Sequence, residues 1–239
     1  MMNTKAIGWF SLSFISVILI LLLYGIFFGG GAVRHETVEQ LVKYRLENSA
    51  NSSFSFLVQI AVSLILTLLF ASFYHYCKEK NNLLATIGVI FIPAYIGLVS
   101  IIAFLHLSVM AKLIELYQLP EYEEAVTMIL NQFLPGAGAS AISRIGNIPY
   151  ALLGISALIF GWIFTRDAKA LKVAGYLIMF NGLGYLSGLG GIFGNNVVTN
   201  ILNTGGVLAF IAALIIFCVV FLFKKKKDSD VSDPIPAQT

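Results

Sequence analysis

Six long apolar runs, separated by short polar segments, occupy most of this chain. Each run is close to the ~20 residues that an α-helix needs to cross ~30 Å of hydrocarbon. The runs cover residues 8–28, 54–74, 83–107, 147–164, 173–190 and 204–223. The pattern predicts an all-α fold, with one bundle of six transmembrane helices over residues 1–223 and a disordered tail over residues 224–239, first basic and then polar.

Two connecting segments are long enough to hold a helix of their own. In residues 34–53, apolar residues recur at helical spacing: Val38, Leu41, Val42 and Leu46. This predicts a short amphipathic helix at the outer membrane interface, ended by the Asn- and Ser-rich residues 48–53.

The second long segment, residues 111–147, predicts another short interfacial helix. Pro120 suits a first-turn position, and Glu123 and Glu124 suit the positive end of the helix dipole. One side of this helix is expected to be apolar: Ala125, Met128, Ile129, Leu130 and Phe133.

Composition agrees with a membrane protein. The chain is 58% hydrophobic and 11% charged, with a mean hydropathy of +0.88, which lies outside the range of soluble domains. Its net charge is only +3, and four of its lysines stand together at 224–227. We therefore expect membrane lipids as partners and no nucleic acid, since a nucleic-acid binder needs a broad basic face.

The distribution of Lys and Arg predicts the orientation. Placing the tail inside gives ten basic residues inside: Lys5, Lys78, Lys80, Arg166, Lys169, Lys172 and the four lysines at 224–227. Five stay outside: Arg34, Lys43, Arg45, Lys112 and Arg144. The positive-inside rule then predicts a multi-pass membrane protein with both termini cytoplasmic.

Small residues gather in the fifth run. Gly184, Gly188 and Gly191 share one face, and such residues let helices approach closely in lipid. Helix packing is the first interpretation of this face. The alternative is a broken helix whose freed backbone groups line a site.

Polar side chains beside this face are candidates for ligand contacts. Asn181 is an amide inside an apolar run, where it needs a hydrogen-bonding partner. It either fixes helix register or contacts a ligand, and Tyr185 and Ser187 would join it on the same path. His106 and Arg144, near the outer ends of their runs, complete the candidate ligand contacts.

No catalytic or metal-binding pattern stands out. The middles of the runs carry no charged residue, which disfavours ion pumps and proton-coupled transporters. The histidines lack metal-ligand spacing, so neither a metal nor a cofactor is expected. A membrane enzyme would require His35, His106, Glu115 and Arg144 to converge at the outer face.

Three stretches carry a resemblance to a known family: residues 162–166 (WIFTR), 171–177 (LKVAGYL) and 181–186 (NGLGYL). In them a short basic turn joins two spans and a glycine- and tyrosine-containing patch follows. The chain resembles the bacterial multi-pass family called domain of unknown function 4386 over about residues 5–223. The resemblance implies a fold and no mechanism.

These patterns favour a non-catalytic binding or accessory protein of the cell envelope. A small-molecule or lipid carrier with a site near Asn181 is the second hypothesis, and a membrane enzyme is the third. Whether a second copy of the chain or another membrane protein is a partner stays open.

Overall fold

The computed structural model describes residues 5–28, 37–134, 145–190 and 197–223, and within them every regular element is a helix. The tail predicted over residues 224–239 lies outside this part. The long helices are α1 (Lys5–Phe28), α3 (Ser49–Cys77), α4 (Asn82–Phe104), α8 (Asn147–Phe164), α9 (Lys169–Gly190) and α10 (Val197–Cys218). The shorter ones are α2 (Val38–Glu47), α5 (Met110–Tyr117), α6 (Glu123–Leu130), a 3-10 turn η2 (Asn131–Phe133) and two π-helical segments, η1 (Leu105–Val109) and η3 (Val219–Phe223).

Five stretches of the described residues are long and apolar enough to cross a membrane. They are Lys5–Leu23, Phe56–Cys77, Asn82–Tyr117, Asn147–Phe164 and Ile201–Phe223. Helix α9, the predicted fifth span, has 22 residues but is richer in glycine and polar side chains and is not among the five. The fold is thus all-helical, with several helices that are long and apolar enough to cross a membrane.

The six long helices form a closed ring in the order α1, α3, α4, α8, α9 and α10, with α10 packed back on α1. Aromatic side chains fill one part of its centre. Five buried phenylalanines from three helices form this phenylalanine cluster, with ring centroids 5.0–6.1 Å apart between helices: Phe70, Phe73, Phe160, Phe164 and Phe217.

Glycines explain why α8, α9 and α10 pack so closely. A Cβ on Gly175 of α9 would lie 2.6 Å from the carbonyl oxygen of Gly161 on α8, and a Cβ on Gly182 would lie 2.7 Å from that of Gly154. Dispersion and hydrogen bonding hold helices together in lipid, so a close backbone approach stabilises the bundle. The low hydropathy of α9 follows from this role, because α9 needs small residues on both of its packed sides.

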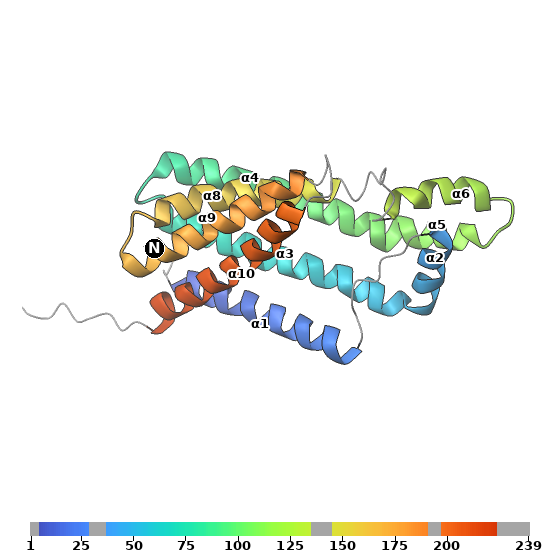
Figure 1. The fold of residues 1–239 in the computed structure, drawn as a ribbon, viewed down its shortest axis with the longest axis horizontal. Helices are drawn as coiled ribbons and strands as arrows, with labels where there is room; N and C mark the ends of the chain where they lie inside the picture. The colour runs from blue at the N-terminus through green and yellow to red at the C-terminus, as the bar shows by residue number, and fades with distance from the viewer. Residues whose placement is uncertain (1–4, 29–36, 135–144, 191–196, 224–239) are drawn as a thin grey trace, which may run out of the picture.

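Two helical stretches are longer than a bilayer core requires. The 29 residues of α3 span ~44 Å and the 36 residues from Asn82 to Tyr117 span ~54 Å, against ~30 Å of hydrocarbon. Their additional turns pack with α2 and α6 at one end of the molecule, here called the α2/α6 end (Figure 1). A second core there joins α2, α5 and α6: Val38, Leu41, Val42, Met110, Leu113, Ile114, Val126, Leu130, Phe133 and Leu134.

The structure corrects the predicted boundaries at this end. Residues 48–53 do not form a loop, because α3 begins at Ser49 and only Asn48 separates it from α2. The third run does not end at residue 107 either, since the helix continues through η1 to Tyr117.

The two predicted short helices do form. Thr37 caps α2 by accepting a hydrogen bond from the Gln40 amide at 3.2 Å, and Val38, Leu41 and Val42 are buried as expected. Leu46, however, is 51% exposed.

In the other short helix the predicted apolar side is partly wrong. Met128 and Ile129 are exposed, while Val126, Leu130 and Phe133 point into the second core. The 3-10 turn that follows α6 carries Phe133 into that core.

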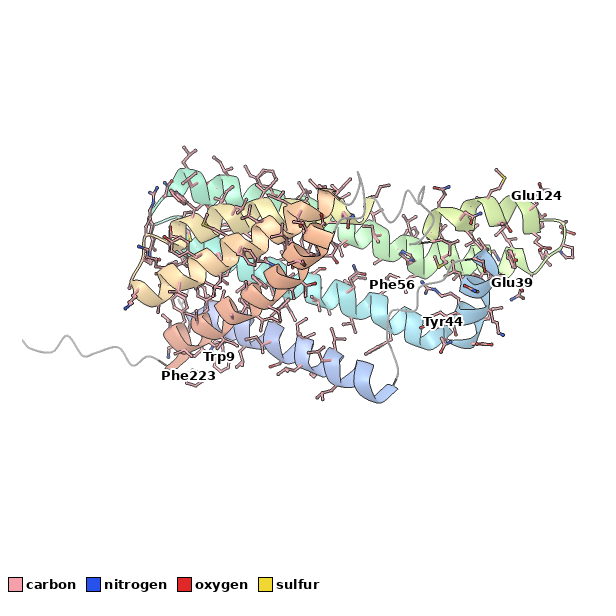
Figure 2. The ribbon with its side chains drawn as sticks, viewed as in Figure 1. Trp9, Glu39, Tyr44, Phe56, Glu124 and Phe223 are labelled. Carbon is pink, nitrogen blue, oxygen red and sulfur yellow. The ribbon has the colours of Figure 1, made fainter. Side chains whose placement is uncertain are left out.

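The opposite end gathers the start of α1 and the end of η3. Trp9 and Phe223 lie there, whereas Glu39, Tyr44 and Glu124 lie at the α2/α6 end (Figure 2). The Cys218 thiol donates to the Gly8 carbonyl at 3.6 Å, which ties α10 to α1. Lys80 also forms an ion pair with Asp167, joining the α3–α4 and α8–α9 turns at this end.

Candidate functional site

A central cavity of about 180 Å³ lies inside the ring and is lined by residues of all six long helices. Its apolar wall comes mainly from α1 and α10, with Phe14, Ile18, Val207 and Phe210. Leu66 also lines it, and Phe70 follows one turn farther along α3, so the phenylalanine cluster adjoins the cavity on the side away from the α2/α6 end.

The opposite wall of the central cavity is polar. It carries Gln59, Ser63, Tyr95, Tyr150 and Tyr185. The Gln59 amide donates to the Tyr150 hydroxyl at 3.2 Å, and the Ser63 and Tyr95 hydroxyls share a hydrogen bond of 3.0 Å. Ring centroids of Tyr150 and Tyr185 are 5.7 Å apart, which places the three tyrosines in one cluster.

Local sequence explains how α3 presents this wall. Gln59 and Ser63 are four residues apart, so they share one face of the helix. The Ser63 hydroxyl bonds the Gln59 carbonyl at 2.8 Å, and a serine that back-bonds in this way can sit inside an apolar helix at low cost. Both side chains therefore face the centre of the ring without breaking α3.

A second cavity of about 290 Å³, the bridging cavity, adjoins the central one on the side of the α2/α6 end. The two cavities share Gln59 and Tyr150 in their walls. The remaining lining of the bridging cavity is mostly apolar: Phe56, Val99, Ile102, His106, Phe133, Gly146, Asn147 and Pro149.

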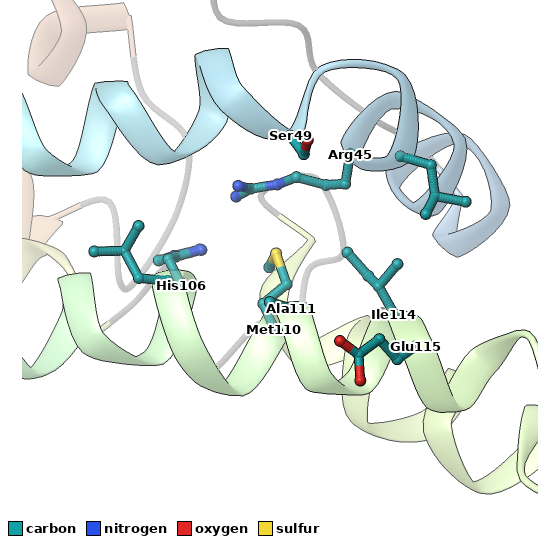
Figure 3. Close-up of a pocket in the computed structure, with 9 residues that line it drawn as sticks. Arg45, Ser49, His106, Met110, Ala111, Ile114 and Glu115 are labelled. Atoms are coloured by element: carbon teal, nitrogen blue, oxygen red, sulfur yellow. The ribbon is translucent and has the colours of Figure 1, made fainter.

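A third cavity of about 220 Å³, the arginine cavity, lies at the α2/α6 end and shares His106 with the bridging cavity. Arg45 projects across it toward His106, with Ser49 beside the Arg45 stem and Glu115 farther along α5 (Figure 3). The His106 ring stacks on Phe56 with centroids 4.4 Å apart. It stands in η1, and π-helical segments often mark functional positions.

The predicted site residues fall in different places. Tyr185 lines the central cavity, and His106 lines the other two. Asn181 lines none of the three, and its amide donates to the Gly206 carbonyl of α10 at 3.1 Å. The Ser187 hydroxyl bonds the Gly184 carbonyl at 2.7 Å.

The predicted packing glycines also differ from one another. A Cβ on Gly184 would come within 2.6 Å of the Leu202 carbonyl, so Gly184 packs directly on α10. A Cβ on Gly188 would meet nothing within 4 Å. Arg144, Gly191 and His35 lie outside the described residues, and the convergence predicted for an outer-face enzyme falls outside them too.

Sequence reasoning missed Gln59, Ser63, Tyr95 and Tyr150. A signal was present, because Gln59, Ser63 and Thr67 form a polar stripe at four-residue spacing inside the second apolar run. Each of these positions has a polar group that requires a partner in lipid.

Among the described residues, no three His, Cys, Asp or Glu side chains come together in a way that could hold a metal ion. No family model, curated protein or solved structure matches this chain. The resemblance to the domain of unknown function 4386 family stays a prediction.

Proposed function

We propose that this chain is a six-span protein of the bacterial inner membrane that binds a small amphiphilic molecule in its central cavity. In this proposal both termini are cytoplasmic, α9 is the fifth span, and the α2/α6 end faces outward, with α2 and α6 at the interface. The observation that carries the proposal is a cavity lined by all six long helices, with one polar and one apolar wall. A ligand that matches both walls has a polar and an apolar part.

The chemistry of the polar wall favours binding over catalysis. It offers hydroxyl groups and one amide, which donate and accept hydrogen bonds. None of these groups is a general base at neutral pH unless a neighbour activates it. The proposed role is therefore that of a binding or accessory protein in the membrane.

A carrier is the second candidate, and the arrangement of the cavities favours it. Three cavities follow one another from the α2/α6 end to the ring centre. Beyond them stand the phenylalanine cluster and the ion pair of Lys80 with Asp167. A carrier would have to open the phenylalanine cluster and this ion pair to release its ligand on the side away from the α2/α6 end.

Native mass spectrometry of the full chain, extracted gently from its own membrane, tests the binding function. We expect a discrete added mass of one bound molecule. Val62→Phe should abolish it, because Val62 lines the central cavity and a phenyl ring would fill that space. Leu64→Phe is the matched control, since Leu64 stands two residues along α3 and is 51% exposed.

Two results would contradict binding in the central cavity. One is a wild-type protein that carries no small molecule when extracted. The other is a bound mass that survives Val62→Phe in a folded variant.

A further inference from the structure

Arg45 carries a positive charge into the arginine cavity and forms no ion pair with any residue that the structure describes. Its side chain is partly buried, and burial lowers the pKa of its guanidinium. Among the described residues no carboxylate pairs with it, and the contact it makes is with the Phe56 ring, 5.3 Å from the ring centroid. A partly desolvated cation is costly unless an anion or hydrogen-bond acceptors offset the lost hydration.

The groups beside Arg45 suit an anion. The Nδ1 atom of His106 is buried and has no hydrogen-bonding partner among the described residues, and the Ser49 side chain lies next to Arg45 (Figure 3). The one carboxylate in the lining, that of Glu115, is bound by Lys112 at 2.6 Å, and both side chains are mostly exposed. The Arg45 N–H groups, the Ser49 hydroxyl and, in the tautomer that carries its proton on Nδ1, the His106 ring can therefore donate to one anion at this side of the cavity.

The surroundings also suit an alkyl chain. His106 separates the arginine cavity from the bridging cavity, whose apolar lining includes Phe56, Val99 and Ile102. That cavity meets the central cavity at Gln59 and Tyr150. One molecule could thus place its head at Arg45 and its chain along the ring axis.

We propose that the arginine cavity binds the anionic head of an amphiphile, a phosphate or carboxylate, whose alkyl chain runs through the bridging cavity toward the central cavity. This inference rests on the proposed function and specifies its ligand class. Arg45 supplies the charge, and the hydrogen bonds to such a head are charge-assisted.

Three probes test the proposal on the full chain in phosphatidylcholine nanodiscs: hexadecyl phosphate, hexadecanol and inorganic phosphate. We expect hexadecyl phosphate to bind at least about tenfold more tightly than either of the others, because it alone has both the head and the chain. Arg45→Gln should remove its advantage over hexadecanol. Lys43→Gln is the matched control, since it removes the same charge from an exposed position on α2 and should leave the advantage intact.

His106→Phe provides a second variant that keeps an aromatic ring stacked on Phe56 but removes Nδ1. It should weaken the binding of hexadecyl phosphate by a few-fold and leave the binding of hexadecanol unchanged. This variant tests the head site even if Arg45→Gln does not fold. Equal binding of hexadecyl phosphate and hexadecanol to the wild-type protein would overturn the anionic head site. Binding of inorganic phosphate as tight as that of hexadecyl phosphate would show a free-anion site and overturn the amphiphile.

The same experiments distinguish failure of the anionic head site from failure of the proposed binding function. If both alkyl probes bind equally and Val62→Phe removes both, the central cavity still binds amphiphiles and only the head site is wrong. If neither alkyl probe binds and the extracted protein carries no ligand, both proposals are wrong.

Discussion

The side-chain amide of Gln59 on α3 donates a hydrogen bond of 3.2 Å to the hydroxyl of Tyr150 on α8, 91 residues farther along the chain. Both residues line the central and the bridging cavities, so this bond stands where the two cavities meet. It fixes the polar wall of the site by joining two helices that both pack on α4.

The Gln59–Tyr150 bond should be measurable as a coupling free energy. Gln59→Leu and Tyr150→Phe each remove one partner, and hydrogen bonds between membrane helices contribute about 0.6 kcal/mol on average and up to about 1.7. A double-mutant cycle on the free energy of unfolding in bicelles should return a coupling in that range. Strictly additive effects of the two substitutions would show that the bond does not form.

Two glycines at the GxxxG spacing should respond differently to the same substitution. Gly184→Ala forces a methyl group against the Leu202 carbonyl and should destabilise the protein by about 1–3 kcal/mol. Gly188→Ala meets open space and should have no destabilising effect from packing. Thermal unfolding of both variants checks this, and equal losses would contradict the packing described for α9 and α10.

Asn181 should affect stability but not ligand binding. Its amide bonds the Gly206 carbonyl, and it lies outside the three cavities. Asn181→Leu should cost about 1–2 kcal/mol in the free energy of unfolding. The affinity for an alkyl probe, measured on the folded variant, should not change; a loss of affinity in a stable Asn181→Leu protein would return Asn181 to the ligand site.

Cysteine labelling tests whether α9 crosses the membrane. In a variant without the buried Cys77 and Cys218, single cysteines replace Leu119, Lys169 or Val198. If α9 is a span, a membrane-impermeant maleimide should label positions 119 and 198 from outside intact cells. It should label position 169 only after the membrane is opened.

Labelling of positions 169 and 198 from the same side would show that α9 does not cross. The protein would then have five spans, and its termini would lie on opposite sides of the membrane.

The sequence was sufficient to predict the all-helical architecture, because apolar runs of bilayer length have few other solutions. It was less informative at the α2/α6 end. Residues 48–53 are polar and have the composition of a loop, but α3 begins at Ser49. The third long helix continues there as α5 beyond the predicted apolar run and packs in a second core with α2 and α6, and contacts of that kind leave no simple periodic pattern.

The site was harder to predict than the fold for a related reason. Gly184 and Gly188 look alike in the sequence, but only the first lies against another backbone. In the sequence, Tyr95 and Tyr150 look like ordinary members of apolar runs. Only the packing of the helices into a ring places them beside Gln59 and Tyr185. The topology prediction counts Arg45 only as a basic residue on the outside, although its side chain projects into a cavity.

An experimental structure of the protein, purified with its own lipids and bound to an antibody fragment for electron microscopy, tests the central claim most directly. The account predicts density for a bound molecule in the central cavity, with its polar part toward Gln59, Ser63 and the tyrosines. A ring centre closed by side chains, with no space between Gln59 and Phe210, would contradict it.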